Sequence, residues 1–129
     1  YNVYTASSGT RDLPHVLGHG DAIDFHNAIG TDRVEARCRE LNAHLRKRFA
    51  EIPSLRLLTP SQHELSSGIA SYSLTKGKNT DLYKRLHDED VVVKLVPKAD
   101  LNAIRLSTHI YVTEEEIDRT ADLIKKMLA

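Results

Sequence analysis

One arginine stands in a short run of alternating apolar and polar residues near the end of the chain, Ile104-Arg105-Leu106-Ser107. If this run is a β-strand, Ile104 and Leu106 share one face, and Arg105, Ser107 and His109 share the other. Arginine presents a planar fork of donors that suits a carboxylate or phosphate held by two hydrogen bonds. The pattern is therefore typical either of an anion-binding site at Arg105 or of an arginine on a solvated sheet face.

A helix start follows this run directly. Thr113 and Glu116 have the S/T-x-x-E spacing of a capping box, in which each side chain accepts a hydrogen bond from the other residue's backbone N–H. Val112 and Ile117 have the spacing of a hydrophobic staple. The sequence thus predicts a strand that leads into the last helix.

The whole segment 104–118, I-R-L-S-T-H-I-Y-V-T-E-E-E-I-D, resembles the C-terminal signature of class V aminotransferases, which are pyridoxal-phosphate enzymes of fold type I. The isopenicillin N epimerase-like, cysteine desulfurase-like and C–S lyase-like branches are the most similar. The resemblance implies that Arg105 binds the α-carboxylate of an amino-acid substrate, with Ser107 and His109 as supporting residues. One departure is that the Tyr-Asn-Thr step of the family is Tyr111-Val112-Thr113 here.

A second motif, Gly9-Thr10-Arg11, lies near the start of the chain. By residue type this segment is either a solvated lead-in or a loop whose N–H groups, hydroxyl and guanidinium hold an anion. The class V resemblance implies that Thr10 contacts the phosphate of the neighbouring subunit's pyridoxal phosphate, with Arg11 as an auxiliary. It also implies a homodimer. We expect residues 1–12 to be a lead-in segment and residues 13–129 to be the small C-terminal domain.

Two helices are expected next. Asp12-Leu13-Pro14 starts the first, which should run to about Ala28 and stop at Gly30. The second opens at Thr31-Asp32 and has an apolar residue every three or four positions, which is the amphipathic signature. This stripe predicts core positions at Val34, Cys38, Leu41, Leu45, Phe49 and Ile52. Cys38 is therefore expected to pack in the core rather than to act as a nucleophile.

The rest of the chain alternates between strands and helices. Strands are predicted at 55–59, 68–74, 91–96 and around Arg105. A short helix should be capped at Thr80-Asp81, and the last helix should bury Ile117, Ala121, Ile124 and Leu128. One-sided helices must cover a sheet, so we expect an α/β (α+β) sandwich with a mostly antiparallel sheet and helices on one face. Class V enzymes share this architecture in their small C-terminal domain.

Composition excludes several function classes. The chain has 18 Lys plus Arg and 18 Asp plus Glu, so no net field favours nucleic acid or an anionic membrane. No apolar run approaches the ~20 residues of a membrane span. His15, His19 and His26 lack a carboxylate or cysteine that would complete a usual metal-ligand pattern. The single cysteine fits a reducing compartment, so we expect a cytoplasmic protein.

Two features of the family are missing from the 129 residues. The Ser-x-His-Lys motif that supplies the Schiff-base lysine does not occur, and residues 91–101 hold no cysteine where cysteine desulfurases carry theirs. We therefore expect a chain that is not catalytic by itself and that needs an upstream large domain to bind pyridoxal phosphate. The chain also begins at Tyr1 rather than methionine, as a fragment or processed product would. The alternative is a stand-alone α/β module that binds a small carboxylate.

Overall fold

The computed structural model describes residues 12–96, 98 and 101–129, with the side chain of His63 set aside. Contacts divide the chain into two units, Tyr1–Val34 and Glu35–Ala129. The second unit is built on a sheet of four strands: β1 (Leu55–Leu57), β2 (Ile69–Leu74), β3 (Lys94–Val96) and β4 (Ala103–Ser107). Their order in the sheet is β1-β2-β4-β3, and every neighbouring pair is antiparallel. The two longest strands therefore lie at the centre.

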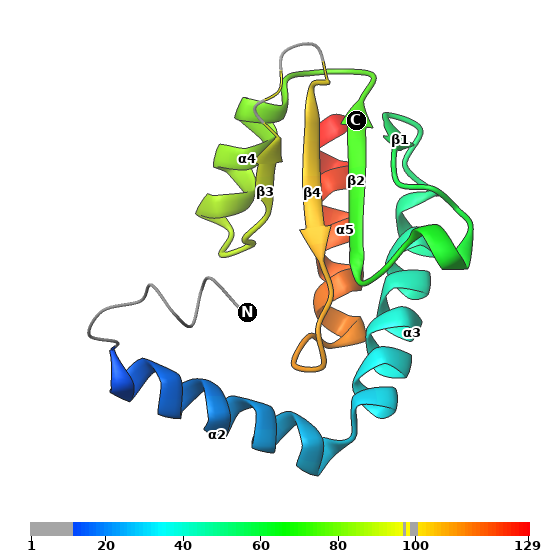
Figure 1. Cartoon of the computed structure of the whole chain (residues 1–129). Helices are drawn as coiled ribbons and strands as arrows, with labels where there is room; N and C mark the ends of the chain where they lie inside the picture. Colours follow the sequence, from blue (N-terminus) through cyan, green and yellow to red (C-terminus); the bar gives the residue numbers. More distant parts are fainter. Residues whose placement is uncertain (1–11, 97, 99–100) are drawn as a thin grey trace. The chain divides into compact units, whose positions relative to one another are not determined.

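Helices α3 (Thr31–Phe49), α4 (Asn79–Asp88) and α5 (Glu114–Leu128) cover one face of this sheet (Figure 1). The core between them is apolar and includes residues of all three helices and both central strands. Its fully buried members include Leu41, Phe49, Leu86, Ile104 and Ile124. The predicted fold class, a mostly antiparallel sheet with helices on one face, is confirmed.

The start of α5 is set by the predicted capping box. The Thr113 hydroxyl accepts from the Glu116 N–H at 3.2 Å, and the Glu116 carboxylate accepts from the Thr113 N–H at 2.9 Å. Val112 is half-buried against the core, as a staple residue would be. Ile117, Ala121, Ile124 and Leu128 are all buried, as predicted.

Three sequence predictions in the second unit are wrong in detail. Helix α4 begins at Asn79, before the predicted cap at Thr80-Asp81, because the Asn79 N–H is satisfied from outside the helix by Asn102 Oδ1 at 2.8 Å. The valine-rich strand contains only residues 94–96, since Val91 instead donates its N–H back to Leu86 O of α4 at 2.9 Å. Predicted strand 55–59 likewise ends at Leu57.

The first unit contains α2 (Leu13–Ile29) within residues 12–34. The Asp12 side chain accepts from the His15 N–H at 3.3 Å, Pro14 lies in the first turn, and Gly30 ends the helix with a φ of 97°. A positive φ of this kind favours glycine. The predicted limits of this helix are therefore confirmed within one residue, whereas α2 buries none of its own residues among those described.

In α3, Leu41, Leu45 and Phe49 are buried and Ile52 follows them into the core, while Cys38 is half-buried. The predicted stripe thus describes the C-terminal part of the helix. In the described part of the chain, no helix has the length and apolar character to cross a membrane.

Candidate functional site

Strand β4 presents Arg105 on the face of the sheet opposite the helices. Ile104 and Leu106 are buried under the helices. Arg105, which lies between them in the sequence, and Ser107, which follows Leu106, are exposed. The alternation is that of a strand with one buried face. The arginine therefore lies on the open face, as the sequence predicts.

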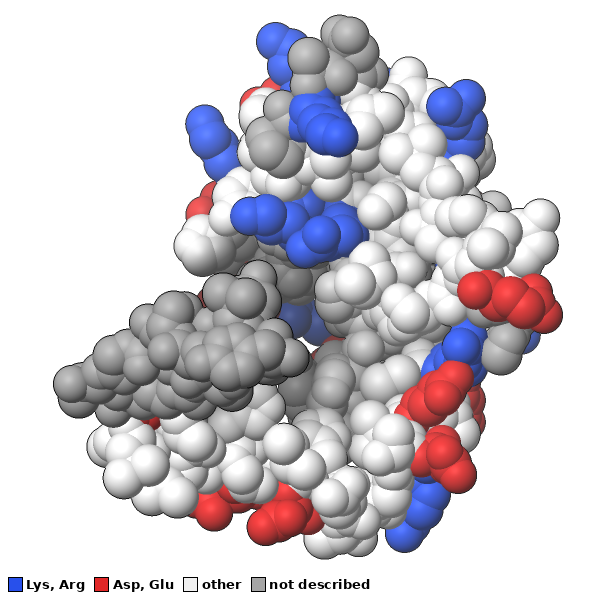
Figure 2. Space-filling view, viewed as in Figure 1, with Lys and Arg blue, Asp and Glu red and all other residues white. Residues whose placement is uncertain are grey.

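The open face brings a second cation next to this arginine. Lys94 of β3 is the direct cross-strand partner of Arg105, and Ser71 of β2 is its partner on the other side. Figure 2 shows basic side chains gathered over β3 and β4. Neither Arg105 nor Lys94 forms a hydrogen bond or ion pair with any described residue. Like charges directly opposite each other destabilise a sheet, so an anionic group between them would relieve the repulsion.

Sequence reasoning missed Lys94 because it appeared as one residue of a valine-rich strand. Its place beside Arg105 depends on the order of the strands in the sheet, in which β3 pairs with β4 and not with β1 or β2. The available signal was weak. A lysine that alternates with apolar residues in a strand indicates an open sheet face, but not which strand lies beside it.

The structure separates Ser107 from His109. Ser107 is exposed at the end of β4, on the face of Arg105. His109 lies beyond the strand, in a turn closed by the Val112 N–H donating to His109 O at 2.9 Å. Its ring is half-buried, with its centroid 4.9 Å from that of Tyr111. The predicted common strand face thus holds for Arg105 and Ser107, while His109 is positioned by the turn.

That turn is anchored by Thr108. Its N–H donates to Gly68 O at 2.7 Å, and its hydroxyl lies 3.1 Å from Gly68 O and 3.2 Å from Cys38 O. These bonds tie the end of β4 to the start of β2 and to α3. The approach is close enough that a Cβ on Gly68 would lie 2.8 Å from Thr108 O. Ser107 and His109 therefore flank a rigid attachment point.

Thr10 and Arg11, the predicted phosphate contacts, lie outside the described residues. A shallow hollow of about 280 Å³ adjoins the open face near Arg105. It is mainly apolar and is lined by Leu58, Thr59, Pro60, Ser71, Val96, Leu101 and Ala103. A ligand anchored by its carboxylate at Arg105 would find apolar surface on the same side of the sheet.

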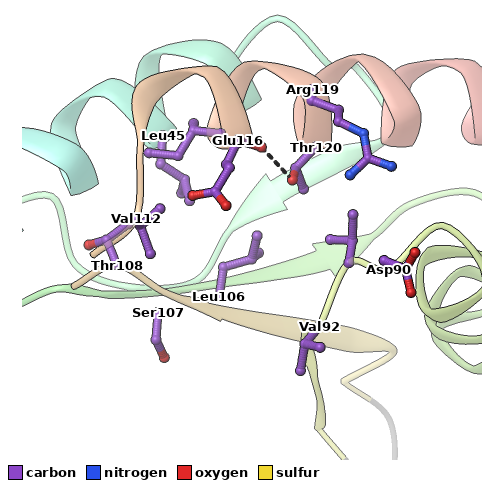
Figure 3. Close-up of a pocket in the computed structure, with 12 residues that line it drawn as sticks. Leu45, Asp90, Val92, Leu106, Ser107, Thr108, Val112, Glu116, Arg119 and Thr120 are labelled. Carbon is purple, nitrogen blue, oxygen red and sulfur yellow. Dashed lines mark hydrogen bonds between the residues drawn. The ribbon is translucent and has the colours of Figure 1, made fainter. Parts of the chain in front are cut away.

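A different cavity, of about 200 Å³, lies where β4, the segment before β3 and α5 meet (Figure 3). Ser107 is at its edge, but Arg105 does not line it. Two of its polar side chains already donate hydrogen bonds to backbone oxygens: Thr120 Oγ1 to Glu116 O at 2.7 Å, and Arg119 Nη2 to Glu89 O, outside the lining, at 2.8 Å. Since these two donors are engaged within the protein and Arg105 lies elsewhere, this cavity is a weaker candidate for ligand binding than the open face.

Residues 2–120 match the sequence model of the family described as aminotransferase class-V. The chain belongs to the class V aminotransferase family. An isopenicillin N epimerase of Streptomyces clavuligerus is 38% identical over 121 residues, which is 90% of this chain and 30% of that protein. A probable cysteine desulfurase of Streptomyces coelicolor is 27% identical over 128 residues, or 89% of this chain and 30% of that protein. The chain thus spans about 30% of the length of these curated relatives.

Solved structures of this family share the fold. The apo cysteine desulfurase of Thermococcus onnurineus NA1 has a TM-score of 0.84 at 18% identity, covering 95% of this chain and 32% of that one. The cystine C–S lyase C-DES, in complex with cysteine persulfide, has a TM-score of 0.80 at 16% identity, covering 92% of this chain and 31% of that one. The class V resemblance predicted from the sequence is confirmed.

The family implies pyridoxal phosphate in the full-length enzyme. A lysine that reacts with its aldehyde must be neutral, and burial lowers a lysine pKa to that end. Every lysine that the structure describes is exposed. Among the described residues, Arg105 and Lys94 could attract an anionic group, whereas no described lysine has the burial that reaction with the cofactor's aldehyde requires. No group of three His, Cys, Asp or Glu side chains in the described part could hold a metal ion.

Proposed function

We propose that this chain is the C-terminal domain of a pyridoxal-phosphate-dependent class V enzyme, in which Arg105 binds the α-carboxylate of an amino-acid substrate. The observation that carries the proposal is the exposed, unpaired Arg105 on the open sheet face of a family member. A carboxylate held by two parallel N–H···O bonds is fixed in direction as well as in place. Such a clamp orients the bonds at Cα for reaction.

Lys94 adds a second positive charge on the same face. Ser107 and His109 support the binding of the carboxylate by Arg105, from the end of β4 and from the turn after it.

Thr10 contacts the phosphate of the neighbouring subunit's cofactor, with Arg11 as an auxiliary, and the enzyme is a homodimer. An upstream large domain supplies the Schiff-base lysine, so this chain is not catalytic by itself. The enzyme is cytoplasmic.

The reaction is an aminotransfer, an epimerisation or a C–S cleavage. The 38% and 36% identities to two isopenicillin N epimerases support the epimerase branch over the desulfurases, which match at 24–28%. Residues 91–101 also hold no cysteine, which argues against a persulfide mechanism of the desulfurase kind. The mainly apolar hollow near Arg105 supports a substrate with an apolar side chain.

Arg105→Ala tests the proposal in the enzyme that includes the upstream domain and the cofactor. Amino-acid binding can be measured from the absorbance of the cofactor. Its affinity should weaken about 10²-fold or more, because hydrogen bonds to charged groups contribute about 1.5–3 kcal/mol each. Arg105→Lys should recover only part of the affinity, since lysine cannot form the bidentate pair. Arg56→Ala, which removes an exposed arginine of the edge strand β1, is the matched control.

An amino-acid amide, which lacks the carboxylate, separates the role of the clamp from a loss of folding. Its weak binding should be the same in the wild type and in Arg105→Ala. Equal loss for both ligands, or no loss for either, would contradict the assignment of Arg105. The chain alone, mixed with pyridoxal phosphate and amino acid, should show no turnover. Turnover by the chain alone would instead contradict the need for an upstream domain.

A further inference from the structure

The strands of the sheet contain basic residues and no acidic ones. Strands β1, β3 and β4 contribute Arg56, Lys94 and Arg105, and no Asp or Glu occurs in any of the four strands. All three basic side chains are exposed. The strands themselves therefore supply positive charge on this sheet without the negative charge that would balance it.

Lys94 and Arg105 are the two members of this group that lie directly opposite each other. Directly opposite residues of an antiparallel pair point to the same side of the sheet, with Cβ atoms about 4.5–5.5 Å apart. Basic side chains gather over these two strands in Figure 2. Neither residue forms a hydrogen bond or ion pair with any described residue. Because like charges so placed destabilise a sheet, the pair is better explained by ligand binding than by folding.

The two cations differ in what they can bind. A guanidinium is a planar fork that takes both oxygens of one carboxylate in parallel hydrogen bonds. A lysine ammonium is a compact point charge on a flexible stem, with three donors that can turn toward an acid group of any geometry. While Arg105 holds one carboxylate, Lys94 can therefore bind a second acid group of the same ligand.

The apolar hollow beside the pair suits the part of a ligand that joins two acid groups. Val96 and Ala103, which are both in its lining, are cross-strand partners of each other. They lie two positions from Lys94 and from Arg105 along β3 and β4, and hence on the same face. The hollow thus adjoins both cations. Its volume of about 280 Å³ and its mainly apolar lining have room for methylene groups.

We propose that Lys94 selects an amino-acid substrate whose side chain ends in a second acid group. Arg105 binds the α-carboxylate, the methylenes of the side chain lie over Val96 and Ala103, and the Lys94 ammonium donates to the distal acid group. L-aspartate and L-glutamate are the simplest amino acids of this class. The inference rests on the proposed function, since it takes Arg105 as the binding site of the α-carboxylate.

Two other roles of Lys94 give different expectations. Lys94 and Arg105 could share a single carboxylate, and a lysine on an outer strand can also act only by discouraging the addition of another strand. Neither role depends on the charge of the substrate's side chain. Dependence of binding on that charge therefore separates the proposed role from both.

The test compares L-glutamate with L-glutamine, its neutral amide, in the enzyme that includes the upstream domain and the cofactor. Affinities are measured from the absorbance of the cofactor. The wild type should bind L-glutamate at least about tenfold more tightly than L-glutamine, because hydrogen bonds between charged groups are the stronger ones. Lys94→Gln should lose this preference, while its affinity for L-glutamine should stay within about twofold of the wild-type value.

Lys94→Arg keeps the positive charge and should keep most of the preference for L-glutamate. Lys84→Gln removes an exposed lysine of α4, on the other face of the sheet, and is the matched control. It should change neither affinity. Circular dichroism checks that each variant folds. The preference of the wild type should also decrease as the salt concentration rises, since salt screens exposed charges.

Equal affinity of the wild type for the two amino acids would overturn the role of Lys94. Equal loss of both in Lys94→Gln would overturn it too, since the lysine would then act on the shared α-carboxylate. Neither outcome affects the role of Arg105, because Arg105→Ala would still weaken the binding of both amino acids. If Arg105→Ala weakened neither, the proposed function and this inference would fail together.

Discussion

Helices α2 and α5 are of similar length and each has a well-formed start, yet only one of them is packed. Helix α5 places Ile117, Ala121 and Ile124 in the core, whereas α2 leaves Val16 and Phe25 exposed and buries none of its described residues. A cap determines where a helix begins, and it contributes only about 0.5–2 kcal/mol. Most of the stability of a helix in a protein comes from packing. The comparison separates these two contributions within one chain.

The largest difference should come from truncating one apolar residue in each helix. Ile124→Ala removes a fully buried side chain from α5 and should lower the free energy of unfolding by about 2–5 kcal/mol. Phe25→Ala removes a side chain of α2 that is 63% exposed and should change it by no more than about 0.5 kcal/mol. Urea denaturation measures both. A comparable cost for Phe25→Ala would show that α2 packs against something in solution.

Glycines provide the next contrast. A Cβ at Gly68 would lie 2.8 Å from the backbone Thr108 O, so Gly68→Ala should destabilise the fold by about 1–3 kcal/mol, as overpacking does. A Cβ at Gly20 of α2 would meet no described atom within 4 Å. Gly20→Ala should therefore raise the helicity of α2, by up to about 1 kcal/mol in helix free energy. Denaturation measures the first, and Cα chemical shifts of residues 13–29 measure the second. Lower helicity in Gly20→Ala would contradict the open surroundings of this residue.

The smallest effect concerns the ion pairs that join α5 to α3. His44 Nε2 and Arg48 Nε each lie 2.8 Å from Asp118 Oδ1. The hydrogen bond from His44, followed by that from Arg48, lowers the pKa of Asp118 against the opposing effect of desolvation. A lowered pKa in the folded state means that this contribution is complete above the unfolded value of about 3.9 and is lost as the pH falls through the folded value.

The free energy of unfolding of Asp118→Asn should therefore fall less than that of the wild type when the pH is lowered below about 4. Asp24→Asn in α2 is the control, because Asp24 forms no ion pair with any described residue. Denaturation midpoints at a series of pH values measure the difference. Identical pH profiles for the wild type and Asp118→Asn would show that these surface pairs contribute nothing measurable, as many exposed pairs do not.

Much of the fold could be predicted because its signals are local. The order of helices and strands, the end of α2 at Gly30 and the Thr113–Glu116 cap all depend on residues within a few positions of each other. The start of α4 could not be predicted in the same way, since its first N–H is satisfied by Asn102, 23 positions along the chain. Tertiary contacts of this kind override local propensity.

The candidate site shows the same division. Arg105 on an open strand face follows from alternation within one segment, and the family resemblance implies its role. Lys94 opposite Arg105 could not be predicted, because it depends on which strands pair and in what register.

Both outer strands of the sheet, β1 and β3, are only three residues long. An outer strand presents unpaired N–H and C=O groups to which another chain can add, and this is a common beginning of aggregation. Short outer strands offer few such groups, and Lys94 places a charge where an added strand would lie. Because the longer strands β2 and β4 are enclosed between them, the domain exposes little template for the addition of another strand.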